Sequence, residues 1–129
     1  MNLNQITVPV TSLSASIAFY ESLGLKLIVR SDPEYARFIC SAGDSTFSLH
    51  RVDVSTSGEN GVWVYFEVED VDKTVAELEA KGVKIEEMPE DKPWLWREAR
   101  IKDPDGNVVI VYRAAEMRKD PPWRLEESK

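Results

Sequence analysis

The chain has 129 residues, a length typical of one domain, and an apolar content of 43% is enough for one packed core. Its net charge of −7 argues against nucleic acid or an anionic membrane as a partner, because both require a basic face. The apolar runs are too short to span a bilayer, and residues 1–10 lack the basic and apolar regions of a signal peptide. A single cysteine, Cys40, rules out an internal disulfide, so we expect a cytoplasmic protein.

An internal repeat organises the sequence. A shift of 58 residues aligns Val10–Leu27 with Val68–Ile85 without a gap, and Gly24 then meets Gly82. The aligned stretch covers the end of a strand, a helix and the start of the next strand. We therefore expect two copies of one module within a single domain spanning residues 1–129.

The first module is expected over residues 3–52. Its β-rich start at 3–10 predicts a strand, and Ser12 stands where a helix N-cap is needed. Apolar residues at three-to-four spacing follow, and Gly24 falls just past the last helical residue. Three further strands are expected at about residues 25–31, 35–41 and 45–52.

A polar linker over residues 53–60 leads to the second module at 61–113. A strand at 61–68, an N-cap at Asp70 and a glycine at Gly82 repeat the pattern of the first copy. The next three strands are expected at about residues 83–88, 95–102 and 107–113. The turn Asp103–Gly106 accounts for its two aspartates, so we assign them no catalytic role. The segment 114–129 is expected to be an irregular tail docked by Trp123.

Each half thus has the order βαβββ, which predicts an α+β protein. In such a unit the helix covers one face of the sheet and leaves the other face open. We expect the two modules to form curved mixed sheets around a central cavity lined by residues of both copies. The sequence leaves open whether the modules pair within one chain or between two.

The run V-x-x-L-x-x-S-I-x-F-Y-x-x-L-G-L at Val10–Leu25, the two βαβββ modules and D-P-D-G-N before the last strand carry a resemblance. Together they resemble the vicinal oxygen chelate superfamily, which includes glyoxalase I, extradiol dioxygenases, fosfomycin-resistance enzymes and bleomycin resistance proteins. The resemblance covers roughly residues 3–113. It implies the fold and a homodimer with small-molecule pockets, but no single activity, because the superfamily spans lyases, oxygenases, transferases and plain binders.

The resemblance also implies where metal ligands would stand, on the first and last strand of each module. The matching positions in this sequence are Gln5, Ser48, Trp63 and Ile110. A divalent cation needs three or four N or O donors, whereas an indole N–H only donates and an alkyl group offers nothing. We therefore expect no metal cofactor, and keep a divalent metal held by Gln5, His50 and Glu98 as the alternative.

His50 is the single histidine of the chain, which excludes the two-His, one-carboxylate triad of an extradiol dioxygenase within one chain. It follows Ser48 by two residues and should face the same side of the strand. Two interpretations stay open. His50 is either a half-exposed residue at a strand end, or a polar group in the pocket that orients a ligand or acts as a base near neutral pH.

The segment Lys92–Ile101 concentrates Trp, Arg and Glu, and alternation places Trp96, Glu98 and Arg100 on one face of the expected strand. This face is either a surface or dimer contact, or an aromatic patch with arginine at the mouth of the pocket, where Glu98 would be a base. Trp63 either packs against a flat ligand or fills the core.

Two hypotheses of function follow. The first is a binding protein similar to bleomycin resistance proteins, which holds a small, partly aromatic or apolar ligand without a metal centre. The second is an atypical metal-dependent or acid–base lyase or isomerase using Gln5, His50 and Glu98. The expected ligand-binding residues are Gln5, Ser48, Trp63, Tyr65, Trp96, Arg100, Ile110 and Tyr112, and the expected catalytic residues are His50 and Glu98.

Overall fold

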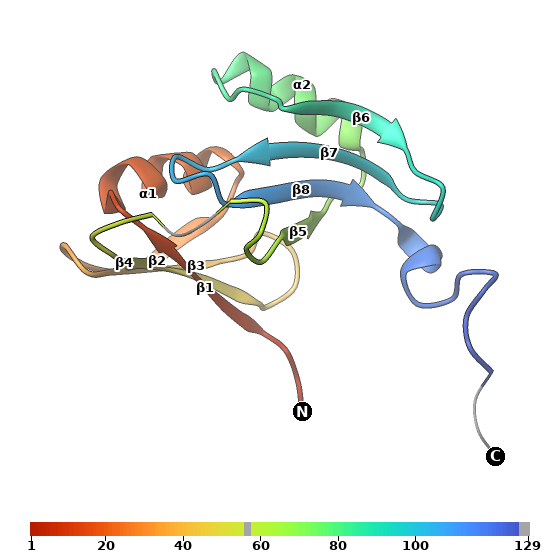
Figure 1. The fold of residues 1–129 in the computed structure, drawn as a ribbon, viewed down its shortest axis with the longest axis horizontal. Helices are drawn as coiled ribbons and strands as arrows, with labels where there is room; N and C mark the ends of the chain where they lie inside the picture. Colours follow the sequence, from red (N-terminus) through yellow and green to blue (C-terminus); the bar gives the residue numbers. More distant parts are fainter. Residues whose placement is uncertain (56–57, 127–129) are drawn as a thin grey trace. The chain divides into compact units, whose positions relative to one another are not determined.

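The computed structural model describes residues 1–55 and 58–126, and Figure 1 shows its elements in chain order. The chain divides into two compact units. The first comprises Met1–Trp63 with Lys102–Val108, and the second comprises Val64–Ile101 with Val109–Lys129. The expected linker and the expected tail each include residues that lie outside the described ranges.

The first unit contains a four-stranded mixed sheet and one helix. Its elements are β1 (Gln5–Val10), α1 (Leu13–Ser22), β2 (Lys26–Ser31), β3 (Tyr35–Ile39) and β4 (Thr46–Arg51). The strand order is β1-β4-β3-β2, with β1 parallel to β4 and the other pairs antiparallel. The parallel pair β1/β4 is possible because the helix and two strands separate these strands in the sequence.

The second unit repeats this plan. Its elements are β5 (Val64–Glu67), α2 (Val71–Ala80), β6 (Glu87–Asp91), β7 (Arg97–Lys102) and β8 (Val108–Arg113), followed by a short 3-10 helix, η1 (Ala115–Arg118). The strand order is β5-β8-β7-β6, with β5 parallel to β8. The prediction of two tandem βαβββ modules of the α+β class is confirmed, and neither sheet closes on itself.

The helices begin and end where the sequence predicts. Ser12 Oγ accepts a hydrogen bond from the backbone N–H of Ala15, and Asp70 accepts one from the N–H of Lys73. Each helix is followed by a glycine with positive φ, +93° at Gly24 and +89° at Gly82, a conformation that strains other residues. No helix in the described ranges is long and apolar enough to cross a membrane.

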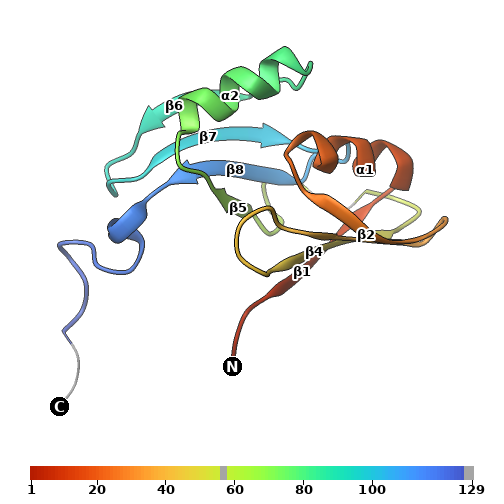
Figure 2. The ribbon, with the colours of Figure 1, turned by 180° about the vertical axis from the view of Figure 1, so that it is seen from behind.

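Each helix lies along one face of its own sheet, as the view from behind in Figure 2 shows. In the first unit, Tyr20 of α1 packs against Phe38 and Phe47, with ring centroids 6.2 and 4.6 Å away. In the second unit, Val75 and Leu78 of α2 are buried. Burial of these apolar faces is the main stabilisation that the sheets receive from the helices.

The duplication is visible in the element boundaries. A shift of 58 residues carries Leu13–Ser22 onto Val71–Ala80, and a shift of 62 carries Thr46–Arg51 onto Val108–Arg113. The extra residues enter around β6, which starts at Glu87 rather than at the expected residue 83. The ladder between β6 and β7 is irregular between Glu87 and Glu90, where Pro89 has no N–H to donate, a defect that an edge strand tolerates.

The tail differs from its prediction. Trp123 is 56% exposed, so it does not dock the segment as expected. The start of η1 is held instead by Glu67 of β5, whose Oε2 accepts hydrogen bonds from the N–H groups of Ala114 (2.8 Å) and Ala115 (2.9 Å). A carboxylate that accepts two backbone N–H groups satisfies donors that would otherwise need water.

Candidate functional site

Each sheet has one face that its helix does not cover, and the candidate site residues gather on these two faces. Alternation along the strands assigns the side chains. The first helix-free face carries Gln5, Thr7, Tyr35, Arg37, Thr46, Ser48 and His50. The second helix-free face carries Tyr65, Glu67, Trp96, Glu98, Arg100, Ile110 and Tyr112.

The first helix-free face carries a network of hydrogen-bonded polar side chains. Gln5 Nε2 donates to Ser48 Oγ at 2.7 Å, and Gln5 Oε1 accepts from the hydroxyl of Thr46. Ser48 Oγ lies 2.6 Å from the hydroxyl of Tyr35, which also accepts from Arg37 Nε at 2.8 Å. Ser48 is buried, while Gln5 is exposed and Tyr35 and Arg37 are partly exposed. Two of the residues expected at a ligand site, Gln5 and Ser48, are therefore in direct contact.

Tyr35 is the titratable centre of this network. Burial disfavours its charged form, but the hydrogen bond with Ser48 and the nearby guanidinium of Arg37 outweigh it and lower the pKa of Tyr35 below its usual value. Neither Tyr35 nor Arg37 was expected at the site from the sequence. A signal was present, because pairing the expected strands 35–41 and 45–52 as a hairpin places these residues opposite His50 and Ser48.

His50 lies on the same face as Ser48, as the alternation predicts. It pairs with Pro9 of β1 and Tyr35 of β3, and its side chain is exposed. The exposed position allows it to meet an outside molecule. It also agrees with a strand-end histidine that faces water.

The second helix-free face has an aromatic centre. Trp96 stacks on Tyr112 with ring centroids 4.9 Å apart, and Tyr65 meets both rings edge-on, at 5.9 Å from Trp96 and 5.5 Å from Tyr112. Offset-stacked and edge-to-face pairs are the favoured aromatic geometries. Tyr112 is buried, but Tyr65 is 40% exposed, so part of this aromatic cluster is open to solvent.

Two charged residues flank the aromatic cluster. Glu98 is only 7% exposed, and its carboxylate accepts a hydrogen bond from the indole N–H of Trp94. Arg100 Nε lies 3.2 Å from a carboxylate oxygen of Glu86. Burial raises the pKa of Tyr65 above its usual value, the negative charge of Glu98 adds to this rise, and Arg100 opposes it.

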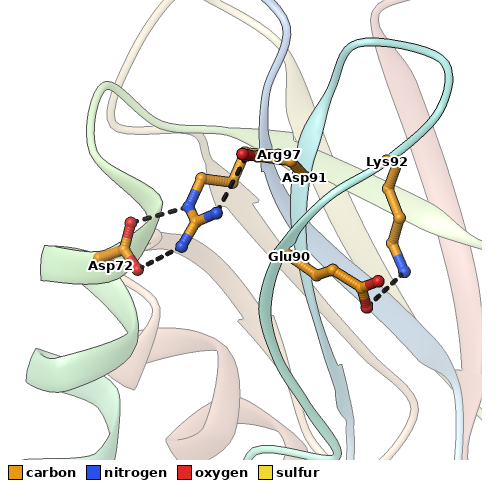
Figure 3. A network of polar contacts seen from close by, with 5 residues as sticks. All are labelled: Asp72, Glu90, Asp91, Lys92 and Arg97. Carbon is orange, nitrogen blue, oxygen red and sulfur yellow. Dashed lines mark hydrogen bonds and ion pairs between the residues drawn. The ribbon is translucent and has the colours of Figure 1, made fainter.

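The contacts of Arg97 show which face of β7 points toward the helix. Arg97 donates two hydrogen bonds to Asp72 at the start of α2, both of 2.8 Å, and a third to Asp91 of β6 at 3.0 Å (Figure 3). Since Arg97 points toward the helix, its neighbours Trp96 and Glu98 must point to the helix-free face. The expected grouping of Trp96, Glu98 and Arg100 on one face is confirmed.

Trp63 lies just before the first strand of the second sheet. It precedes β5, is 40% exposed, and its indole N–H donates to the backbone oxygen of Glu59 at 3.0 Å. Ile110, two residues before Tyr112 on β8, is buried. The structure therefore brings together Tyr65, Trp96, Glu98 and Tyr112 in one cluster, and Gln5 with Ser48 in the other.

The turn Asp103–Gly106 and the residue that follows it form hydrogen bonds with residues of the first copy. Asp103 accepts a hydrogen bond from the hydroxyl of buried Tyr20 at 2.7 Å, and Asp105 accepts hydrogen bonds from the backbone N–H and the hydroxyl of Thr11. Asn107 donates to the backbone oxygen of Pro9 at 3.1 Å. These contacts lie within the first unit, and sequence spacing alone gave no sign of them.

Comparison with known proteins assigns the chain to a family. The model of the Glyoxalase/Bleomycin resistance protein/Dioxygenase superfamily matches residues 2–111. The chain belongs to this superfamily. A relative, the "Uncharacterized protein YraH" of Bacillus subtilis (strain 168), is 34% identical over 128 residues, which cover 88% of this chain and 98% of the relative.

Solved structures of superfamily proteins share the fold. The lactoylglutathione lyase of Agrobacterium tumefaciens aligns with a TM-score of 0.71 and 23% identity, over 87% of this chain and 92% of its own. A bleomycin resistance determinant encoded on the transposon Tn5 aligns with a TM-score of 0.72 and 18% identity, over 88% and 98%. One of these proteins is named as an enzyme and the other as a resistance determinant, so superfamily membership alone does not decide the activity.

The residues at the metal-ligand positions implied by superfamily resemblance do not fit a divalent cation. Ile110 has no donor atom, and the Trp63 indole offers only an N–H, which is bonded to Glu59. The amide of Gln5 is bonded to Ser48 and Thr46. Within residues 1–55 and 58–126, no three His, Cys, Asp or Glu side chains come together as a group that would hold a metal.

Proposed function

We propose that this superfamily member is a binding protein for a small, partly aromatic or apolar molecule, and that it binds without the usual metal centre. The observation that carries the proposal is the aromatic cluster of Tyr65, Trp96 and Tyr112 on the second helix-free face. Flat side chains that remain partly open to solvent offer a stacking surface for a flat ligand. The side chains at the metal-ligand positions support the metal-free part of the proposal.

As part of this proposal, the chain acts as a homodimer in the cytoplasm. Superfamily resemblance suggests the dimer, and the free thiol of Cys40 is compatible with a reducing compartment. Light scattering during gel filtration should therefore give twice the mass of one chain. A protein that has the mass of one chain and still binds the ligand would contradict the dimeric part of the proposal.

A titration of tryptophan fluorescence with flat aromatic probes tests the binding function. We expect 2-naphthamide to quench the fluorescence saturably in the wild-type protein. The Trp96→Ala variant should bind about tenfold more weakly or worse, because it removes a stacking partner. Trp123→Ala is the matched control, since Trp123 is an exposed tryptophan outside the cluster, and it should leave the affinity unchanged.

The alternative function is an atypical metal-dependent or acid–base lyase or isomerase that uses Gln5, His50 and Glu98. The observation in its favour is the buried carboxylate of Glu98, since acid–base groups in enzymes are often shielded from water. Elemental analysis of the purified protein separates the two functions. A stoichiometric metal that is lost in the His50→Ala variant would support the enzyme and overturn the metal-free binding protein.

A further inference from the structure

The polar network of the first helix-free face ends at a cation without an acidic partner. Arg37 Nε donates to Tyr35, and the guanidinium carbon lies 5.3 Å from the centre of the Tyr35 ring. Within the described residues no carboxylate forms an ion pair with Arg37, whereas Arg30 and Arg51 each pair with an aspartate. The chain has 23 acidic residues and 16 Lys and Arg. Arg37 nevertheless has no carboxylate partner among the described residues, so its partly exposed side chain can bind an anion from solvent.

The hydroxyl of Tyr35 can also donate a hydrogen bond to an anion. Ser48 Oγ already accepts a hydrogen bond from Gln5, so its own hydroxyl can donate a hydrogen bond to Tyr35, which also accepts one from Arg37. Two donors directed at the Tyr35 oxygen leave the phenolic proton for a further acceptor. The lowered pKa of Tyr35 makes this proton a stronger hydrogen-bond donor.

We propose that Arg37 and Tyr35 form a subsite that binds a carboxylate group, and that Ser48 and Gln5 position it. The terminal nitrogens of a guanidinium match the two oxygens of a planar carboxylate, and the phenol adds a neutral donor beside them. The subsite lies within the first unit, and it goes beyond the proposed function because it recognises an acidic group rather than an aromatic ring. Tyr35 and Arg37 are both partly exposed, so the carboxylate can reach them from solvent.

A pair of probes of nearly the same shape tests the subsite. We compare 2-naphthoate, which carries a carboxylate, with neutral 2-naphthamide by fluorescence and calorimetric titration at neutral pH. Wild-type protein should bind 2-naphthoate more tightly. Arg37→Gln should weaken the binding of 2-naphthoate by about tenfold to a hundredfold, and it should change the affinity for 2-naphthamide by less than about twofold. Arg37→Lys should restore only part of the affinity, since an ammonium lacks the planar fork.

A control substitution and the pKa of Tyr35 provide two independent checks of the subsite. Arg30→Gln removes an arginine that is paired with Asp32 and lies outside the network, and it should leave both affinities unchanged. In NMR spectra of ring-labelled tyrosine, the pKa of Tyr35 should rise when 2-naphthoate binds, because a nearby negative charge disfavours the phenolate. Ser48→Ala should raise the pKa of Tyr35 in the free protein, since it removes a hydrogen bond that stabilises the charged form.

The outcomes distinguish this inference from the proposed function. Equal binding of the two probes, with no effect of Arg37→Gln, would overturn the carboxylate subsite and leave the aromatic binding function intact. Absence of binding by either probe would overturn the binding function and the subsite with it. A selective loss of 2-naphthoate in a folded Arg37→Gln variant is the result that we expect.

Discussion

At the scale of single residues, the hydrogen bond from Tyr20 to Asp103 joins a helix to a turn that is 83 positions away in the sequence. Both side chains are buried, and Asp103 also accepts from the backbone and side chain of Asn107. Burial is the main reason that the pKa of Tyr20 lies far above its usual value, and the charge of Asp103 adds to it. The tyrosine therefore stays neutral and donates to the aspartate at any physiological pH.

This contact leads to a prediction for Tyr20→Phe. The variant keeps the ring packing but removes the hydroxyl that donates a hydrogen bond to Asp103, and it should lower the free energy of unfolding by about 2 kcal/mol, typical of hydrogen bonds to charged groups. Tyr65→Phe is the control, because Tyr65 is 40% exposed, and should change stability by less than about 0.5 kcal/mol. Urea unfolding followed by circular dichroism measures both. An equal effect of the two substitutions would contradict the assigned role of Asp103.

Glu67 provides a pH-dependent contact. Partial burial disfavours its charged form, but the N–H groups of Ala114 and Ala115 outweigh it, so the pKa of Glu67 lies below its usual value. A depressed pKa in the folded state means that this contact stabilises above the unfolded-state pKa and is lost as the pH falls through the folded-state value. We expect the amide resonances of Ala114 and Ala115 to shift in that acidic range.

The Glu67→Gln variant is the matched test, because it keeps the shape of the side chain without the charge. In this variant the two amide resonances should no longer titrate with the carboxylate, and the hydrogen exchange of the tail should be faster near neutral pH. Titration of these amides that persists in Glu67→Gln would assign the effect to another group.

At the scale of elements, the two helices were predictable to within a residue because local chemistry fixes their ends. Ser12 and Asp70 cap the N-termini, and Gly24 and Gly82 supply the left-handed conformation after the C-termini. The start of β6 was not predictable in the same way. Its partner strand and the irregular ladder near Pro89 decide where pairing begins, and neither is encoded in local propensity.

In the candidate site, too, some features were predictable from local sequence and others depend on tertiary structure. Alternation along β7 was enough to place Trp96, Glu98 and Arg100 on one face, since the period of a strand is fixed. The partners of Glu98 and the network around Tyr35 depend on which strands pair and in which register. Such contacts join residues far apart in sequence, so the positions of single residues do not reveal them.

Gly24 follows α1 with a φ of +93°. An added Cβ at Gly24 meets no atom within 4 Å, so Gly24→Ala carries only the cost of a positive φ. That cost should lower the free energy of unfolding by about 1 kcal/mol. Gly24→Asn should cost less, because asparagine tolerates the left-handed region better. Equal stability of the alanine variant and the wild type in urea would show that this backbone conformation carries no strain.

At the scale of the whole molecule, the two units do not coincide with the two copies in the sequence. The turn between β7 and β8 belongs to the first unit together with residues of the first copy. It supplies acceptors to Tyr20 and Thr11 through Asp103 and Asp105, and Asn107 donates to Pro9. The first copy therefore obtains part of its hydrogen bonding from a turn that belongs to the second copy in the sequence.

This sharing predicts that the first copy does not fold alone. A fragment of residues 1–60 retains the apolar core of α1 and its sheet, but it leaves the buried hydroxyl of Tyr20 without its acceptor and is marginal in size. We expect its NMR amide spectrum to show little dispersion, whereas the full chain unfolds cooperatively. The full-length variant with Asp103→Asn and Asp105→Asn should remain folded but be less stable, which separates the loss of two charges from the loss of the whole turn. A dispersed spectrum and a cooperative melt of the fragment would contradict the dependence of the first copy on this turn.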